Sequence, residues 1–135
     1  MTRRSSGLKA RELLMKHMTP EQLVAFQRGD RYILCKGSWT GLEYHVPHGG
    51  GFVRSPALRT DWCVHQSILS IPSEDAALAK KLMIETNEFR FVNTANSLNA
   101  VSHTLLFKYG LLRYRSAAGV LVLAGLIAGG VLYAF

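Results

Sequence analysis

The sequence predicts an α+β fold: a small antiparallel sheet with helices, followed by a linker helix and one C-terminal transmembrane helix. Three observations lead to this prediction. The spacing of apolar residues along 8–96 changes from helical to alternating and back to helical. Two short motifs mark helix starts, at residues 19–22 and 73–75. The segment 117–135 carries no charged residue. We therefore divide the chain into a basic tail (1–7), a folded domain (8–96), a linker (97–116) and a span (117–135).

The N-terminal part of the domain predicts two short helices. Apolar residues recur at helical spacing within 7–18. Thr19 to Gln22 then reads as a helix start, with Thr19 as N-cap, Pro20 at the first position and Gln22 closing a capping box. Gly29 is expected to end this helix. Its apolar residues are expected to face the core: Leu23, Val24 and Phe26.

The middle of the domain predicts a small sheet. Residues 31–36 alternate, with Tyr32 and Leu34 on one face. A turn is expected at 37–41, and a second strand follows with Leu42, Tyr44 and Val46 on one face. Residues 52–53 and 60–67 are expected to form a third and a fourth strand, the latter with Trp62 facing away from Cys63.

A long helix is expected from residue 73. Ser73 is a candidate N-cap, and Glu74 and Asp75 suit the positive end of a helix. Its apolar stripe is expected to face the core, and the helix to end at 93–96. The residues of this stripe are Leu78, Leu82, Phe89 and Val92. The linker 97–116 is expected to form an interfacial helix.

The uncharged segment 117–135 predicts a membrane anchor. A bilayer core of about 30 Å needs about 20 helical residues, which this segment and Ser116 supply. Basic and aromatic residues flank the segment, as interface residues of a membrane protein do. They are Lys108, Tyr109, Arg113, Tyr114, Arg115 and Tyr133. The positive-inside bias then predicts a single-pass, tail-anchored protein in contact with membrane lipids, its N-terminal domain in the cytoplasm or on the inner side of a virion membrane.

Small residues within this span indicate a contact between helices. Gly125 and Gly129 form a G-x-x-x-G pair, and Ala124 and Ala128 stand beside them. The partner could be another copy of the chain or a different subunit. Small residues are also common in membrane spans that contact no other helix.

The formal charge of +7 and the isoelectric point near 9.8 favour anionic partners. These could be lipid headgroups, an acidic protein surface or nucleic acid, and a solvated basic surface is the plainer alternative. Aromatic residues could stack on bases, although no RNP-like or helix-turn-helix pattern accompanies them. They are Tyr32, Trp39, Tyr44 and Trp62. The same residues also suit the core of a small sheet.

Cysteine and histidine residues offer two further alternatives. A zinc site could be drawn from Cys35, His45, His48, Cys63 and His65. Cys63 and His65 could instead form a nucleophile pair, but no nucleophile elbow or oxyanion loop accompanies them. The plain alternative is structural packing, with Cys63 as a small apolar residue of the sheet. We therefore predict no catalytic residue, no metal and no cofactor, and we expect Cys35 and Cys63 to stay reduced in the cytoplasm.

Several motifs along residues 8–96 occur in a fixed order. Thr19-Pro-Glu-Gln22 precedes Cys63-Val-His65. Ile71-Pro-Ser-Glu-Asp75 follows, then Leu78-Ala-Lys-Lys-Leu82, Glu85-Thr-Asn-Glu88-Phe89 and Ala95-Asn96. This series resembles a small domain found in uncharacterised bacterial and phage proteins. The resemblance implies a shared fold and a bacterial or phage setting, and it implies no reaction.

Taken together, these patterns favour an accessory role. We expect a membrane-anchored structural subunit of a larger bacterial membrane complex or phage assembly, which docks through its basic domain and its glycine-containing span. One alternative is a self-assembling pore or lysis protein. Another is a zinc- or thiol-dependent site around Cys63 and His65. No enzymatic activity is predicted.

Overall fold

The computed structural model describes residues 3–64, 71–98 and 108–109 of the chain. Two helices come first, followed by four strands, a long helix and a two-residue strand. Their bounds are α1 (Arg3–Lys16), α2 (Pro20–Arg28), β1 (Tyr32–Lys36), β2 (Glu43–Pro47), β3 (Val53–Ser55), β4 (Thr60–Cys63), α3 (Ser73–Thr94) and β5 (Asn96–Ser97). The strands form one antiparallel sheet in the order β1-β2-β3-β4-β5.

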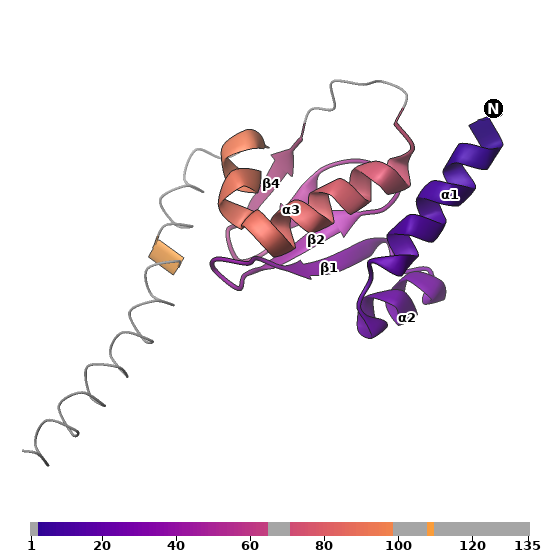
Figure 1. Cartoon of the computed structure of the whole chain (residues 1–135). Coiled ribbons are helices and arrows are strands. Elements are labelled where there is room, and N and C mark those ends of the chain that lie inside the picture. The colour runs from indigo at the N-terminus through magenta and orange to yellow at the C-terminus, as the bar shows by residue number, and fades with distance from the viewer. Residues whose placement is uncertain (1–2, 65–70, 99–107, 110–135) are drawn as a thin grey trace, which may run out of the picture.

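The predicted combination of a small antiparallel sheet with helices is therefore confirmed. Figure 1 shows α3 running across the sheet, with α1 beside it and α2 at the end of the molecule near β1. Each strand pairs with the next one along the chain, so short connections suffice. The strand β5 was not predicted. It pairs Asn96 with Cys63 and Ser97 with Trp62 immediately after α3 ends.

The start of α2 forms as its sequence predicts. The Thr19 side chain accepts a hydrogen bond from the Gln22 backbone, and the Gln22 side chain accepts one from the Thr19 backbone. Gly29 ends the helix in the left-handed conformation, with φ of 93°. The predicted inward face is partly wrong. Phe26 is buried, but Val24 is 62% exposed, and Gln22 is buried instead.

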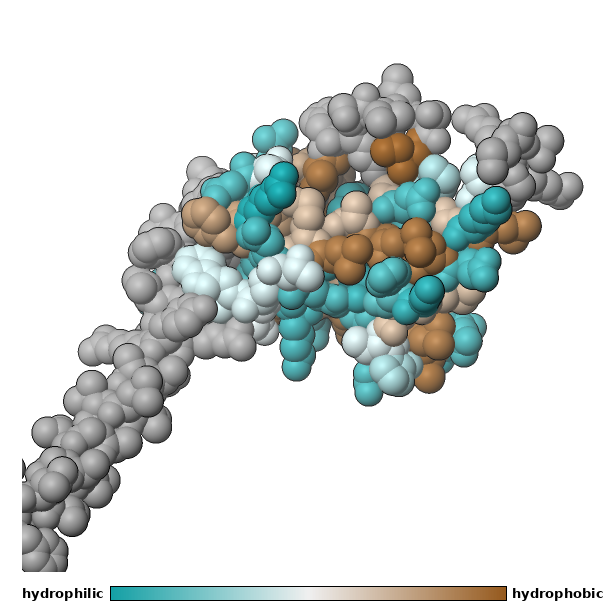
Figure 2. Space-filling view, in the orientation of Figure 1, coloured by the Kyte–Doolittle hydropathy of each residue, from teal (hydrophilic) through white to brown (hydrophobic). Residues whose placement is uncertain are grey.

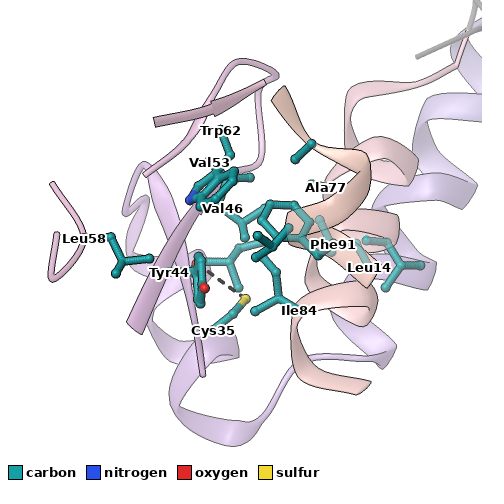
Figure 3. Packing of buried hydrophobic residues seen from close by; sticks show 14 of the residues in the cluster. Leu14, Cys35, Tyr44, Val46, Val53, Leu58, Trp62, Ala77, Ile84 and Phe91 are labelled. Atoms are coloured by element: carbon teal, nitrogen blue, oxygen red, sulfur yellow. Dashed lines mark hydrogen bonds between the residues drawn. The ribbon is translucent and has the colours of Figure 1, made fainter. Parts of the chain in front are cut away.

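The sheet has one buried face, which packs against α3. Ile33 and Cys35 of β1 point to this face, so Tyr32 and Leu34 lie on the opposite one. Tyr44 and Val46 of β2 and Trp62 of β4 are fully buried, as their predicted faces require. Figure 3 shows these side chains converging on Phe91 and Ile84 of α3.

The buried stripe of α3 differs from the predicted one. Leu78 and Val92 are buried, but Leu82 is 36% exposed and Phe89 57% exposed. The residues that face the sheet recur three and four positions apart and include two charged side chains. They are Ala77, Lys81, Ile84, Glu88 and Phe91. The helix also kinks at Asn87, where φ is −150° and ψ is 67°.

The start of α3 also differs from its prediction. Ser73 is the first helical residue rather than the N-cap. The N-cap is Pro72, and no side chain caps the helix by a hydrogen bond. The Ser73 hydroxyl instead donates to the Glu74 carboxylate. The backbone amides of the first turn therefore have no capping side chain.

The predicted transmembrane helix is corrected. Within residues 3–64, 71–98 and 108–109, no helix combines the length and the apolar character needed to cross a membrane. The longest described helix, α3, has 22 residues but carries charges along its whole length, among them Lys80, Lys81, Glu85 and Glu88. Within these residues the fold is α+β, and the predicted descriptions membrane, single-pass, transmembrane and tail-anchored are withdrawn.

Most residues behind that prediction lie outside the described part of the chain. These include the segment 117–135, the small residues Ala124, Gly125, Ala128 and Gly129, and the interface residues Arg113, Tyr114, Arg115 and Tyr133. Of the interface residues, Lys108 and Tyr109 are described, and both are exposed. The pore alternative also depends on the segment 117–135.

Candidate functional site

The most unusual side chain of the fold is the carboxylate of Glu88, which is 0% exposed. Its Oε2 accepts hydrogen bonds from the backbone amides of Trp39 at 2.9 Å and Thr40 at 2.7 Å. Its Oε1 accepts from the Thr40 hydroxyl at 2.5 Å and the Tyr44 hydroxyl at 2.7 Å. Each carboxylate oxygen thus accepts two hydrogen bonds, and the donors belong to the β1–β2 turn and to β2. This set, Glu88 with Trp39, Thr40 and Tyr44, is called the Glu88 cluster below.

The Glu88 cluster fastens the β1–β2 turn to α3. The Ser38 hydroxyl accepts a hydrogen bond from the Glu88 backbone at 3.0 Å, and the Ser38 backbone donates to Ile84 at 3.0 Å. Gly37 makes room for the carboxylate. A Cβ at this position would lie well under 3.0 Å from the Glu88 carboxyl group, a distance that real Cβ atoms essentially never show. Burial, and then the bond to Glu88, raise the pKa of the Tyr44 phenol, so this donor stays protonated.

The fastened turn places an aromatic pair at the surface. The rings of Trp39 and Phe89 meet edge to face, with centroids 6.0 Å apart. Trp39 is partly buried against the core, whereas Phe89 is 57% exposed. Phe89 directly follows the buried Glu88, and Trp39 directly precedes Thr40. The buried carboxylate and the surface rings are therefore parts of one rigid connection between β1–β2 and α3.

A groove lies beside this pair, between α2, β1 and α3. It encloses about 470 Å³ and is called the edge groove, and its lining residues are Thr19, Glu21, Gln22, Ala25, Leu34, Lys36 and Glu85. Leu34 is 48% exposed and supplies its apolar floor. Its charged lining residues are Glu21, Lys36 and Glu85, and Glu85 is ion-paired with Lys81. Hydrogen bonds to the Glu21 backbone and the Thr19 side chain lower the pKa of Glu21, so this carboxyl group is ionised at neutral pH.

A polar network forms the wall of the edge groove. The Gln22 amide donates to the Leu34 carbonyl at 2.6 Å and to Glu85 Oε1 at 3.0 Å. Lys81, 2% exposed, forms an ion pair with the other Glu85 oxygen. The i,i+4 pairing of Lys81 and Glu85 agrees with their spacing, but the burial of Lys81 does not follow from it.

One edge of β1 faces the edge groove. Gly37 donates to the Leu42 carbonyl, so residues 33, 35 and 37 exchange hydrogen bonds with β2. By alternation, the backbone groups of Leu34 and Lys36 point away from β2. The bond from Gln22 to the Leu34 carbonyl agrees with this, and it satisfies one of these outward groups. The remaining outward amides lie on an exposed strand edge.

The cysteine and histidine candidates are not brought together. Cys35 is fully buried on the core face of β1, whereas His45 lies on the opposite face and pairs with Glu43 at 2.7 Å. Cys63 lies on β4, two strands beyond β2. Among the residues that the structure describes, no group of three or more histidine, cysteine or acidic residues could hold a metal ion. His65 lies outside them.

The remaining candidates are distributed over the fold in other ways. His48 Nε2 donates a hydrogen bond to the Asp30 carbonyl, and its ring meets Phe26 edge to face, which is a structural role. Both cysteines are free thiols. Of the four aromatic candidates for base stacking, Tyr44 and Trp62 are fully buried, so they cannot stack on a base.

Comparison with known proteins adds no functional information. No protein-family model, curated protein or solved structure matches this chain. The resemblance to small domains of bacterial and phage proteins is therefore untested.

Sequence reasoning missed the residues that organise this site. Glu88 and Lys81 carry charges and were not among the residues predicted to face the core, yet both are buried. One signal was present in the sequence: the turn 37–41 is rich in small and hydroxyl residues, which offer donors but no side chain bulk. Such a turn can accommodate a carboxylate from another element.

Proposed function

We propose that this domain is an accessory, protein-binding module that docks on a larger assembly through Trp39, Phe89 and the adjoining edge groove. The proposal assigns binding and not catalysis. Its setting in a bacterial complex or a phage assembly rests on the resemblance in sequence alone.

The observation that supports the proposal most is the rigid attachment of an exposed aromatic pair. A buried, unpaired carboxylate is costly unless its hydrogen bonds are complete. Here four donors satisfy Glu88, and the result is a turn that holds Trp39 against Phe89. Binding hot spots are enriched in tryptophan and other aromatic residues, and preorganised side chains lose little entropy on binding.

The edge groove supports a partner of defined chemistry. Leu34 and Ala25 would accept an apolar side chain, while Glu21 would attract a basic one. The outward amides of Leu34 and Lys36 could pair with an extended segment, as in recognition by strand addition. The expected partner is therefore an extended protein segment with an apolar residue next to a basic one.

In Figure 2 the surface of α3 is not uniformly hydrophilic. Hydrophobic side chains are interspersed with hydrophilic ones across the face that α3 presents in this view. Leu82 and Phe89, both exposed, belong to this helix.

A comparison of co-purified proteins tests the proposal. The full-length chain, its Phe89→Glu variant and its Leu8→Glu variant are isolated from the native source and the accompanying proteins are identified. Leu8 is 70% exposed on α1, so Leu8→Glu is a matched control for an added charge at an exposed apolar residue. The proposal expects a defined set of proteins with the wild type and Leu8→Glu, and its loss with Phe89→Glu. Retention of the same set by Phe89→Glu contradicts it.

A further inference from the structure

A second site, lined by other residues than the edge groove, lies around a buried lysine. Lys80 of α3 is 5% exposed. Among the described residues, its ammonium group donates a hydrogen bond to the carbonyl of Gly51 at 3.0 Å. An ammonium group has more donors than this bond uses. Burial lowers the pKa of Lys80 because the charged form loses its hydration.

No acidic side chain neutralises this lysine. The chain has nine acidic residues, and all of them lie in the described part: Glu12, Glu21, Asp30, Glu43, Asp61, Glu74, Asp75, Glu85 and Glu88. None forms an ion pair with Lys80. By contrast, the neighbouring Lys81 is paired with Glu85. Buried charges in proteins are normally paired, but no acidic side chain pairs with Lys80, and the nearby Cys63 only partly opposes the lowering of its pKa.

Lys80 lines a pocket of about 340 Å³, and the start of α3 lines the same pocket. Ser73 and Ala76 of the first helical turn line it, and this helix end has no side-chain cap. The amides of an uncapped first turn attract an anion. Glu74 and Asp75 belong to the same turn, but neither lines the pocket.

The other described side chains that line the pocket are three apolar ones and the thiol of Cys63. Phe52 is 50% exposed and Ile71 38% exposed, and both line it beside Val64. A pocket with one cationic end and apolar walls matches a ligand with an anionic head and an apolar tail. A bare phosphate ion would leave these walls uncovered, since it has no apolar part.

From this arrangement we propose that the Lys80 pocket binds a small carboxylate with an apolar tail. The carboxylate would accept hydrogen bonds from the Lys80 ammonium and from the first-turn amides of α3. The tail would cover Phe52 and Ile71. This site is separate from Trp39 and Phe89, so it goes beyond the proposed docking role.

Calorimetric titration of the full-length chain tests the proposal, with hexanoate as the probe at about pH 6.5, well below the ordinary pKa of lysine. Hexanol has the same tail without the charge, and inorganic phosphate has charge without a tail. We expect saturable binding of hexanoate, and binding weaker by about tenfold or more for both hexanol and phosphate. Absence of hexanoate binding, or equal binding of hexanol or of phosphate, overturns the proposal.

The variant Lys80→Met ties the binding to the residue. Methionine fills similar space without charge, and replacing an unpaired buried charge does not weaken a fold, so the variant is expected to fold. Circular dichroism checks this. Hexanoate affinity should fall about tenfold or more in Lys80→Met, and should be unchanged in Lys9→Met, where the lysine is exposed on α1. Equal affinity of folded Lys80→Met and wild type contradicts the site.

Discussion

The Glu88 carboxylate occupies the space that a side chain at residue 37 would need, and Gly37 leaves it free. A Cβ at Gly37 would meet the carboxyl carbon and both oxygens of Glu88. The two residues are 51 positions apart in sequence, yet they determine together how the β1–β2 turn joins α3. Because the same carboxylate holds the Trp39 and Thr40 amides, this relationship also sets the position of the surface aromatic pair.

The loss of stability caused by a substitution at Glu88 should grow with the number of hydrogen-bond donors that it leaves without an acceptor. Glu88→Ala leaves four donors unsatisfied and should lower the free energy of unfolding by about 3–5 kcal/mol. Glu88→Gln should cost less, about 1–2 kcal/mol, because its amide can donate to the Thr40 and Tyr44 hydroxyls while its oxygen accepts the backbone amides. Urea unfolding measures both. The exposed Glu12→Gln is the control, and equal losses for Ala and Gln at position 88 would count against the cluster.

Gly37→Ala should be destabilising only while Glu88 is present. The added methyl group must displace the carboxylate, with an expected loss of about 1–3 kcal/mol. In the Glu88→Ala background the same change should cost less than about 1 kcal/mol, so a double-mutant cycle should show strong coupling. Gly49→Ala is the matched control, because nothing lies within 4 Å of a Cβ there. Additive effects of the two substitutions would show that the predicted clash does not occur.

The two cysteines should differ in reactivity toward a thiol reagent. Cys35 is fully buried, and burial followed by the charge of Glu85 raises the pKa of its thiol. Cys63 is partly exposed. In the native protein only Cys63 should react, and both thiols should react in urea. The Cys63→Ser variant should therefore show almost no reaction until it unfolds. Rapid native labelling of Cys35 would mean that the core around β1 opens readily.

The pH dependence of stability should show the burial of Lys80. Its folded pKa lies below the unfolded value of 10.5, so below that value the unfolded state binds more protons than the native state. The destabilisation that comes from burying the charged lysine is largest below the folded pKa. It disappears as the pH rises from the folded pKa to the unfolded pKa. The free energy of unfolding of Lys80→Met minus that of the wild type should therefore shrink as pH rises through the lowered folded pKa towards 10.5. Urea unfolding without added carboxylate measures it, and a constant difference would contradict the lowered pKa.

Local signals in the sequence were sufficient for some elements. The α2 start depends on Thr19, Pro20 and Gln22 alone, and its capping box forms as predicted. The buried faces of β2 and β4 follow from simple alternation around Tyr44 and Trp62. Such signals need no knowledge of what the element packs against.

The missed features depend on partners far away in sequence. A pattern of apolar residues places Leu82 and Phe89 inward, whereas Lys81 and Glu88 take those positions because Glu85, Thr40 and Tyr44 satisfy them. The kink at Asn87 was also missed, because no proline marks it. Pairings across about 50 residues cannot be read from a periodicity of three and four. The transmembrane prediction rested on 117–135, a segment outside the described residues.

Site-specific photo-crosslinking at residue 89 tests the docking role most directly. A photoreactive phenylalanine analogue replaces Phe89 in the full-length chain, or Leu8 on α1 as the control, and the cells or particles are irradiated. The account predicts a discrete adduct with a protein partner from position 89, mapped to a segment that carries an apolar residue beside a basic one, and no such adduct from position 8. The absence of any adduct at position 89, or the same adducts from both positions, would contradict the claim that Trp39 and Phe89 form the docking surface.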